Sequence, residues 1–424
     1  MKKNNIYLII SIVSFYIILF YILFLKWAIN ASVSPIVCVS TALLFMINFK
    51  KNIKMIKTKY IIIALSFLFI ILLNLLFTYE HTYFYGNIVN AILMPFLSAL
   101  YFVLIIQNEK EKLYKYIFKP SFFILNFYYI INFFIVLKQI STPGFLLHNF
   151  TTNSFYLDHV DGLIGANGTA KLMLFNIICI NLNLSFSYSK NSKISKFSKF
   201  MFIFTLLSSC YVSLMNDSRM YYILLLLFML PIFIKISKGN FNITKFNINV
   251  IRVIVIVIVM LFASLVLYSN NSEFKNLIDK NFIDNYFNRT VQDIGTSGNE
   301  ERVRLLKIAV ENGDGLKLGK GIGSLPFDGS GYVKHFGLND FNVRIYNGGI
   351  IYVIILLAVY ATIYEGILHL NSKQYLFRIY YFIILLILGL YTQVYTYCDK
   401  NILLSLIFIT TYYFHECEER RNLE

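Results

Sequence analysis

The sequence predicts an all-α polytopic integral membrane protein with about twelve transmembrane helices and one large extracytoplasmic loop that carries short helices. Three observations predict this class. Hydrophobic residues make up 58% of the 424 residues and charged residues only 14%, whereas about a quarter of a typical soluble protein is charged. The apolar residues form long uncharged runs, as bilayer-spanning helices do. Most Lys and Arg residues lie between these runs.

The apolar runs give the expected order of the helices. A window of about 19 residues finds runs at 6–25, 32–49, 60–77, 88–106, 120–137, 168–186, 200–215, 220–234, 251–268, 349–368, 379–395 and 401–414. The first run is longer than a usual signal-peptide core and no small-residue cleavage pattern follows it, so we interpret it as an anchor. The expected organisation is nine helices in residues 1–268, an extracytoplasmic loop at 269–344, and three helices with a short cytoplasmic tail in 345–424.

The positions of the basic residues predict the orientation. Basic clusters occur around residues 50–59, 110–119, 190–199 and 235–252. The short loops that alternate with these clusters hold only Lys26, Lys138, Arg219 and Lys400. Because short loops rich in Lys and Arg stay in the cytoplasm, we expect both termini there. The net charge of +16 therefore reflects membrane topology, and we expect no nucleic-acid partner.

Cysteine and histidine spacing predicts neither a disulfide framework nor a zinc site. The five cysteines and six histidines are scattered, and no ligand spacing of the usual kind occurs. The acidic run Asp158–Asp161 could offer oxygen ligands to a hard cation, although such runs are more often polar loops. We expect no metal and no cofactor.

The large outer loop contains a predicted helix with two arginines. Ser297 and Glu300 have capping-box spacing, so a helix should run from about Gly298 to Asn312. Arg302 and Arg304 are about 200° apart on such a helix, so both cannot point into one pocket. Arg302 shares a stripe with Leu306 and Ala309, whereas Arg304 shares one with Lys307 and Glu311. We favour Arg302 as the ligand arginine, and the alternative is that both are solvated charges.

A glycine-rich segment follows this helix, at Gly319–Ser324. Its spacing fits neither the Walker A motif nor the dinucleotide-binding fingerprint, because Gly315 is too close and Gly321 follows Lys320. A tight turn with its amides directed toward an anion is the interpretation left open.

Two further basic points lie at membrane boundaries. Arg219 follows an apolar run, where an arginine either reaches water, pairs with Asp217 or meets an anion. The stretch that ends the large loop brings His335, Asp340 and Arg344 close together in sequence. An imidazole or a carboxylate with a raised pKa suits a general base, so His335 and Asp340 are the candidate catalytic residues.

Four local patterns, in this order and topology, resemble the O-antigen polymerase and ligase family, the Wzy-type membrane proteins. They are Asp161–Ala170, Asn216–Arg219, Arg302 with Leu318–Gly323 downstream, and Asn339–Phe341 followed by Tyr346–Ile351. The resemblance covers roughly residues 160 to 355. The chain departs from the family's ligases in one place, since His335 stands ahead of Asn339 rather than directly before it.

The resemblance implies a polysaccharide polymerase of the bacterial cytoplasmic membrane. Its donor would be a polyprenyl-pyrophosphate-linked oligosaccharide, and a chain-length regulator and a flippase would be its partners. The implied pyrophosphate ligands are Arg219, Arg302, Arg304 and Arg344, since arginine suits a phosphate leaving group. One alternative is a ligase that moves the polymer to another acceptor. Another is a flippase or transporter, which would place its basic residues inside the bundle and show internal repeats.

Overall fold

The computed structural model describes residues 3–25, 32–55, 58–78, 82–142, 145, 161–164, 169–187, 189, 191–215, 219–233, 236–237, 240–241, 272, 275, 298–312, 318–326, 339–368 and 375–423. The elements of the first part are α1 (Lys3–Phe20), η1 (Tyr21–Leu25), α3 (Ser34–Ile47), α4 (Phe49–Met55), α5 (Thr58–Phe77), α6 (Phe84–Gly86), η2 (Asn87–Leu93), α7 (Met94–Ile106), α8 (Lys110–Leu113), η3 (Tyr114–Phe118) and α9 (Lys119–Ser141). Those that follow are η5 (Gly162–Ile164), α10 (Thr169–Phe186), α11 (Ser192–Met215), α12 (Arg219–Phe233), β1 (Ile236–Ser237), β2 (Asn240–Phe241), α16 (Gly298–Asn312), α17 (Asp340–Leu368), α18 (Tyr375–Tyr391) and α19 (Cys398–Leu423).

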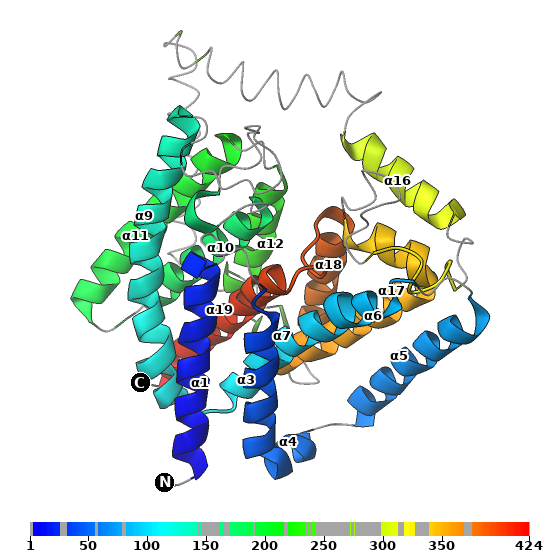
Figure 1. Cartoon of the computed structure of the whole chain (residues 1–424). Coiled ribbons are helices and arrows are strands. Elements are labelled where there is room, and N and C mark those ends of the chain that lie inside the picture. Colours follow the sequence, from blue (N-terminus) through cyan, green and yellow to red (C-terminus); the bar gives the residue numbers. More distant parts are fainter. Residues whose placement is uncertain are drawn as a thin grey trace.

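The described chain is dominated by helices, which confirms the predicted all-α membrane class. Within the described residues, 6 helices are long and apolar enough to cross a membrane. Shorter apolar helices cover Ser34–Ile47 and Arg378–Tyr391. The strands form one small antiparallel pair in which Ile236 is opposite Phe241. In Figure 1, α1, α3 and α9 run nearly parallel, whereas α5 and α17 run obliquely to them.

Most of the predicted apolar runs coincide with helices. The predicted helix at Gly298–Asn312 is confirmed as α16 with the same bounds. The run at 251–268 lies outside the described residues. The run at 349–368 covers only the second part of α17, which already begins at Asp340. A hydropathy window misses this first part because Asp340, Asn342, Arg344 and Asn347 interrupt its apolar residues, although all of it is buried in the fold.

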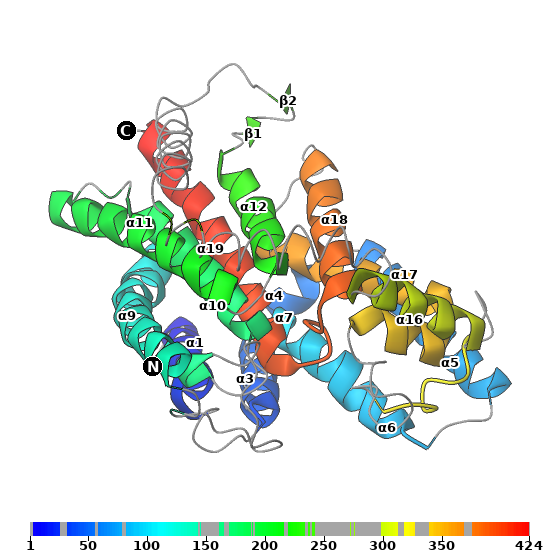
Figure 2. The same cartoon turned by 90° about the horizontal axis from the view of Figure 1, so that it is seen from above.

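Two helices show how burial separates the interior from the lipid-facing surface. Every residue of α10 from Lys171 to Phe186 is buried, and this helix packs against α9, α11 and α19 (Figure 2). Its buried asparagines need partners, and Asn183 Nδ2 donates to Asn126 Oδ1 on α9 at 2.8 Å. In contrast, α5 packs on α17 yet exposes Leu65, Phe69 and Leu76, an apolar surface of the kind that lipid covers.

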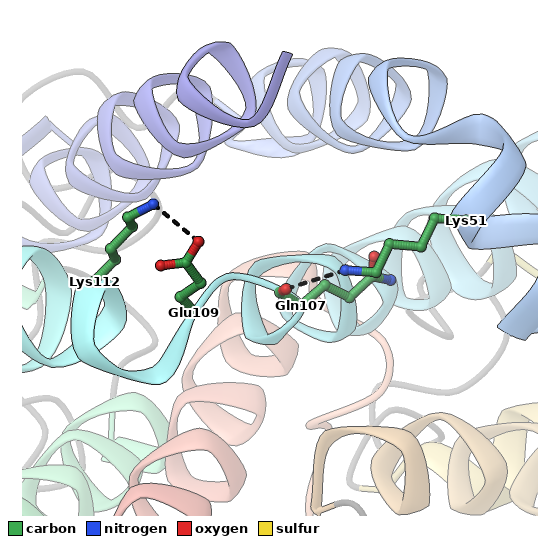
Figure 3. Close-up of polar contacts among 4 residues, drawn as sticks. All are labelled: Lys51, Gln107, Glu109 and Lys112. Carbon is green, nitrogen blue, oxygen red and sulfur yellow. Dashed lines mark hydrogen bonds and ion pairs between the residues drawn. The ribbon is translucent and has the colours of Figure 1, made fainter. Parts of the chain in front are cut away.

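The two predicted cytoplasmic connections around 50–59 and 107–119 lie together in the structure. Lys51 Nζ donates to the carbonyl of Gln107 at 3.4 Å, and Lys112 pairs with Glu109 at 3.0 Å (Figure 3). This contact joins α4 to the turn between α7 and α8. The lysines of the two segments also predict that both lie on the same side of the membrane.

Candidate functional site

The candidate site is built around a break in α17. Gly349 has φ 77 and ψ 175, so the helical backbone is interrupted there. We call Asp340–Gly348 the half-helix. All of its residues are buried. It begins with a conventional cap, since Asn339 Oδ1 accepts a hydrogen bond from the Asn342 amide at 2.8 Å. A wholly buried helical segment with charged side chains is costly, and such segments in membranes usually serve a function.

Asp340 ties the half-helix to the connection between α18 and α19. Its Oδ2 accepts from the Tyr395 amide at 2.7 Å, and its Oδ1 accepts from the Thr396 hydroxyl. The Asp340 amide also donates to the carbonyl of Thr392 at 2.9 Å. The carboxylate is only 1% exposed and both its oxygens are engaged. In this arrangement Asp340 positions the backbone of the connection.

Arg344 lies one turn after Asp340 and is 4% exposed. It interacts electrostatically with Asp340, Tyr352 and Tyr360. Its Nε and Nη2 atoms are buried and have no hydrogen-bond partner within the described residues. These two atoms form the side of a guanidinium that can hold two oxygens of one phosphate or carboxylate. An oxyanion would therefore satisfy donors that the described chain leaves unsatisfied.

Further buried charges are linked to Asp340 through Lys400. Lys171 of α10 pairs with Asp399 of α19 at 3.4 Å. Lys400 follows Asp399, and its Nζ lies 4.6 Å from the centre of the Tyr397 ring. Lys400 also interacts electrostatically with Asp399, Lys171, Asp340 and Asp161. We call Asp161, Lys171, Asp340, Arg344, Asp399 and Lys400 the buried charge cluster, in which no residue is more than 9% exposed.

The predicted site residues are distributed as follows. Asp340 and Arg344 both lie in the buried charge cluster. Arg219 is the first residue of α12 and Arg302 lies in α16, but their side chains are outside the described part of the structure. Arg304 is exposed on α16, beside an ion pair between Lys307 and Glu311 at 3.7 Å. This confirms the predicted solvated face. His335 lies outside the described residues.

The interpretation of the glycine-rich turn as an anion site is wrong. The Lys320 and Gly321 amides donate to the carbonyls of Tyr346 and Asn347 at 2.8 and 2.9 Å. The Ile322 amide donates to Asn74 Oδ1 at 2.7 Å. The Leu325 amide donates to Asn347 Oδ1 at 3.2 Å. These amides already donate to acceptors within the protein, so they are not free to hold an anion.

Sequence reasoning missed Lys171, Asp399 and Lys400 as site residues. Its position places Lys400 in a short outer loop, and Lys171 lies within an otherwise uncharged run. The available signal was the presence of ionisable residues at the ends of membrane helices, which marks them as functional candidates. Their mutual contact could not be read from the sequence, because α10 and α19 are far apart along the chain.

Comparisons with known proteins do not assign a function to this site. No protein-family model matches the chain, and a comparison with curated proteins finds no match. Within the described residues, no group of three His, Cys, Asp or Glu residues is placed to hold a metal ion. The function is therefore argued from the residues and their contacts.

Proposed function

We propose that the chain is a polysaccharide polymerase of the bacterial cytoplasmic membrane. It would join polyprenyl-pyrophosphate-linked oligosaccharide repeat units on the outer face of that membrane. In this proposal about twelve helices cross the bilayer, the termini are cytoplasmic, and the region 269–344 is extracytoplasmic. The loop's length of about 75 residues is itself unusual for a connection without a function.

The observation that carries the proposal is the buried, incompletely bonded guanidinium of Arg344. In the proposed reaction, an acceptor hydroxyl attacks the anomeric carbon of the donor sugar. The bond from that carbon to the pyrophosphate oxygen breaks, and the electron pair leaves with the diphosphate. A fixed arginine that is shielded from water stabilises such charge more strongly than one in bulk solvent. Arg219 and Arg302 are the other favoured ligands of the diphosphate, and Arg304 is the alternative to Arg302 on the same helix.

The acceptor hydroxyl must also lose its proton as it attacks. Asp340 already accepts hydrogen bonds from Tyr395 and Thr396, so it would have to give one up to take that proton. This favours a positioning role for Asp340. His335 is then the candidate base. Direct attack would invert the configuration of the anomeric carbon, as the family resemblance implies. The residues invoked here need neither a metal nor a nucleotide.

One observation favours a second candidate, a transporter or flippase of lipid-linked saccharide. Lys171, Arg344 and Lys400 lie inside the helix bundle, where a transporter places the charges that meet its substrate. A ligase that moves finished polymer to another acceptor would use the same residues as the polymerase. These three activities leave different products in the cell.

The deciding experiment is a gel of surface polysaccharide from a deletion strain complemented with wild type, Arg344→Ala, Arg344→Lys, Arg302→Ala or His335→Ala at matched expression. Arg378→Lys is the control, because Arg378 pairs with Glu365 at 2.8 Å outside the buried charge cluster. Collapse of the ladder to single repeat units in Arg344→Ala and Arg344→Lys supports the polymerase. Long chains left on the carrier lipid indicate a ligase, and units held on the cytoplasmic face indicate a transporter. A wild-type ladder with Arg344→Ala contradicts the role of Arg344.

A further inference from the structure

The break in α17 is filled by the loop of residues 318–325. A helix that is interrupted at Gly349 loses its regular hydrogen-bond ladder there, and backbone groups freed within a membrane protein need other partners. The carbonyl of Tyr346 accepts from the Lys320 amide at 2.8 Å, and that of Asn347 accepts from the Gly321 amide at 2.9 Å. The loop backbone thus runs directly against the end of the half-helix.

Three buried asparagines hold this loop, and we call Asn74, Asn87 and Asn347 the asparagine clamp. Asn74 Nδ2 donates to the carbonyls of Leu318 at 2.6 Å and Asn347 at 3.3 Å, while its Oδ1 accepts from Ile322. Asn87 Nδ2 donates to the carbonyls of Ile322 and Leu325. These contacts join α5 and η2 to a segment that lies far away in the sequence.

The third asparagine belongs to the half-helix itself. Asn347 Oδ1 accepts from the Ser324 hydroxyl at 2.9 Å and from the Leu325 amide at 3.2 Å. Its Nδ2 donates back to the Leu325 carbonyl at 3.2 Å. The side chain therefore pairs with both the N–H and the C=O of Leu325, as a strand partner would.

Apolar contacts connect the clamped loop to the half-helix and to α16. Leu325 packs in one cluster with Ala309 of α16 and with Val343 and Tyr346 of the half-helix. Figure 1 shows α16 beside α17 at this end of the molecule. Val343 and Arg344 are consecutive, so a shift of the loop would act on the segment that carries the arginine.

We infer that the asparagine clamp is a positioning device that fixes the loop 318–325 in the break of α17. It thereby holds the half-helix, with Arg344, and α16 in one arrangement. Asn74 acts through the loop backbone and is not itself a catalytic residue. The position of the loop follows from these contacts alone, whereas the effect of the clamp on the binding of an anionic ligand rests on the proposed function.

The loop contacts are tested by hydrogen–deuterium exchange of the full chain in detergent micelles. Asn74→Ala removes the acceptor of the Ile322 amide, so peptides covering 318–325 should exchange at least about tenfold faster. The matched control is Asn126→Ala, because Asn126 is also buried in an apolar helix and accepts from Asn183 at 2.8 Å. The control should leave the exchange of 318–325 unchanged. Equal exchange in Asn74→Ala and wild type overturns the inference.

A second variant covers the case in which Asn74→Ala does not fold. Ser324→Ala removes the hydroxyl that donates to Asn347 Oδ1 or to the carbonyl of Gly321, and it leaves the three asparagines in place. It should accelerate exchange in the same peptides by a smaller factor, about twofold to fivefold, and leave α10 unaffected. Acceleration spread evenly over the chain would mean general destabilisation and would contradict a local clamp.

The link to the arginine is tested by binding of farnesyl pyrophosphate, used as the probe. Arg344→Ala and Asn74→Ala should each weaken binding about tenfold or more, and the double variant should bind no more weakly than Arg344→Ala alone. Losses that multiply in the double variant overturn the positioning role. If Arg344→Ala binds the probe as wild type does, the proposed function fails, while the exchange experiment still decides the clamp.

Discussion

The ammonium of Lys171 lies 3.4 Å from Oδ2 of Asp399, and this buried ion pair joins α10 to α19. Their side chains are only 4% and 11% exposed. Replacing one partner leaves an uncompensated buried charge, which typically costs about 3–5 kcal/mol, whereas replacing both with apolar groups is often neutral. The two charges are therefore expected to affect stability as a unit.

Lys171→Met and Asp399→Leu should each lower the free energy of unfolding by about 3 kcal/mol or more. The double variant Lys171→Met with Asp399→Leu should recover most of that loss. Unfolding of the purified protein by denaturant in detergent micelles measures all the variants. If the two losses simply add in the double variant, the pair does not act as a unit.

Thr396→Val should destabilise the protein by about 1–3 kcal/mol, because it removes a donor to the buried carboxylate of Asp340. The control is Thr362→Val, since among the described residues the Thr362 hydroxyl donates only to the carbonyl of Val359 on its own helix, at 2.7 Å. That change should be close to neutral. Thermal unfolding followed by far-ultraviolet circular dichroism compares the two, and equal shifts would count against a special role for Asp340.

Gly319→Ala should be strongly destabilising. Gly319 has φ 71, and an added Cβ would lie 2.6 Å from the backbone oxygen of Tyr346. Both the strained backbone and the clash would push the loop out of the break in α17. At Gly366 the nearest atoms to such a Cβ are side-chain carbons of Val103 at 3.7 Å. Gly366→Ala should therefore be neutral or stabilising in the same unfolding measurement.

Arg304→Ala should retain most of the polymer made by wild type, since Arg304 lies on the exposed face of α16. Arg302→Ala should abolish long chains while the protein still inserts into the membrane. Complementation of a deletion strain, with immunoblotting for the amount of protein, makes the comparison. An essential Arg304 together with a dispensable Arg302 would reverse the assignment of the two helix faces.

Cysteine labelling tests the proposed orientation of the chain. Lys307→Cys should react with a membrane-impermeant maleimide in intact cells, because 269–344 is proposed to be outside. Lys112→Cys should react only after the cells are permeabilised. Both lysines are exposed or half-exposed in the structure, so accessibility to the reagent does not limit either reaction. Labelling of both in intact cells would refute the topology. A strain without the native cysteines provides the background.

Much of the helical order could be predicted from the sequence. Apolar runs must become helices in a bilayer, because only a helix satisfies its own backbone there. The helix α16 could also be predicted with its bounds, since its start and stop signals are local. The solvated face of Arg304, Lys307 and Glu311 follows from helical spacing alone.

The site could be predicted only in part. Asp340 and Arg344 stand out as charged residues beside an apolar run, but their burial depends on α16, the loop 318–325 and the connection from α18 to α19. The glycine-rich loop illustrates the limit most clearly. Its backbone amides could serve an anion or the protein, and the sequence around it does not contain the asparagine on α5 that decides the matter.

The sequence by itself determined most of the helical segments, because hydropathy and capping act over a few residues. Only the tertiary structure decided that α17 begins at Asp340, that Lys171 meets Asp399, and that Asn74 bonds to the loop 318–325 and to the carbonyl of Asn347. The physical reason is that a buried charge or amide is stable only with a partner, and here each partner comes from a distant helix. The local sequence shows where a polar side chain is, whereas the packed fold determines which group forms a hydrogen bond or an ion pair with it.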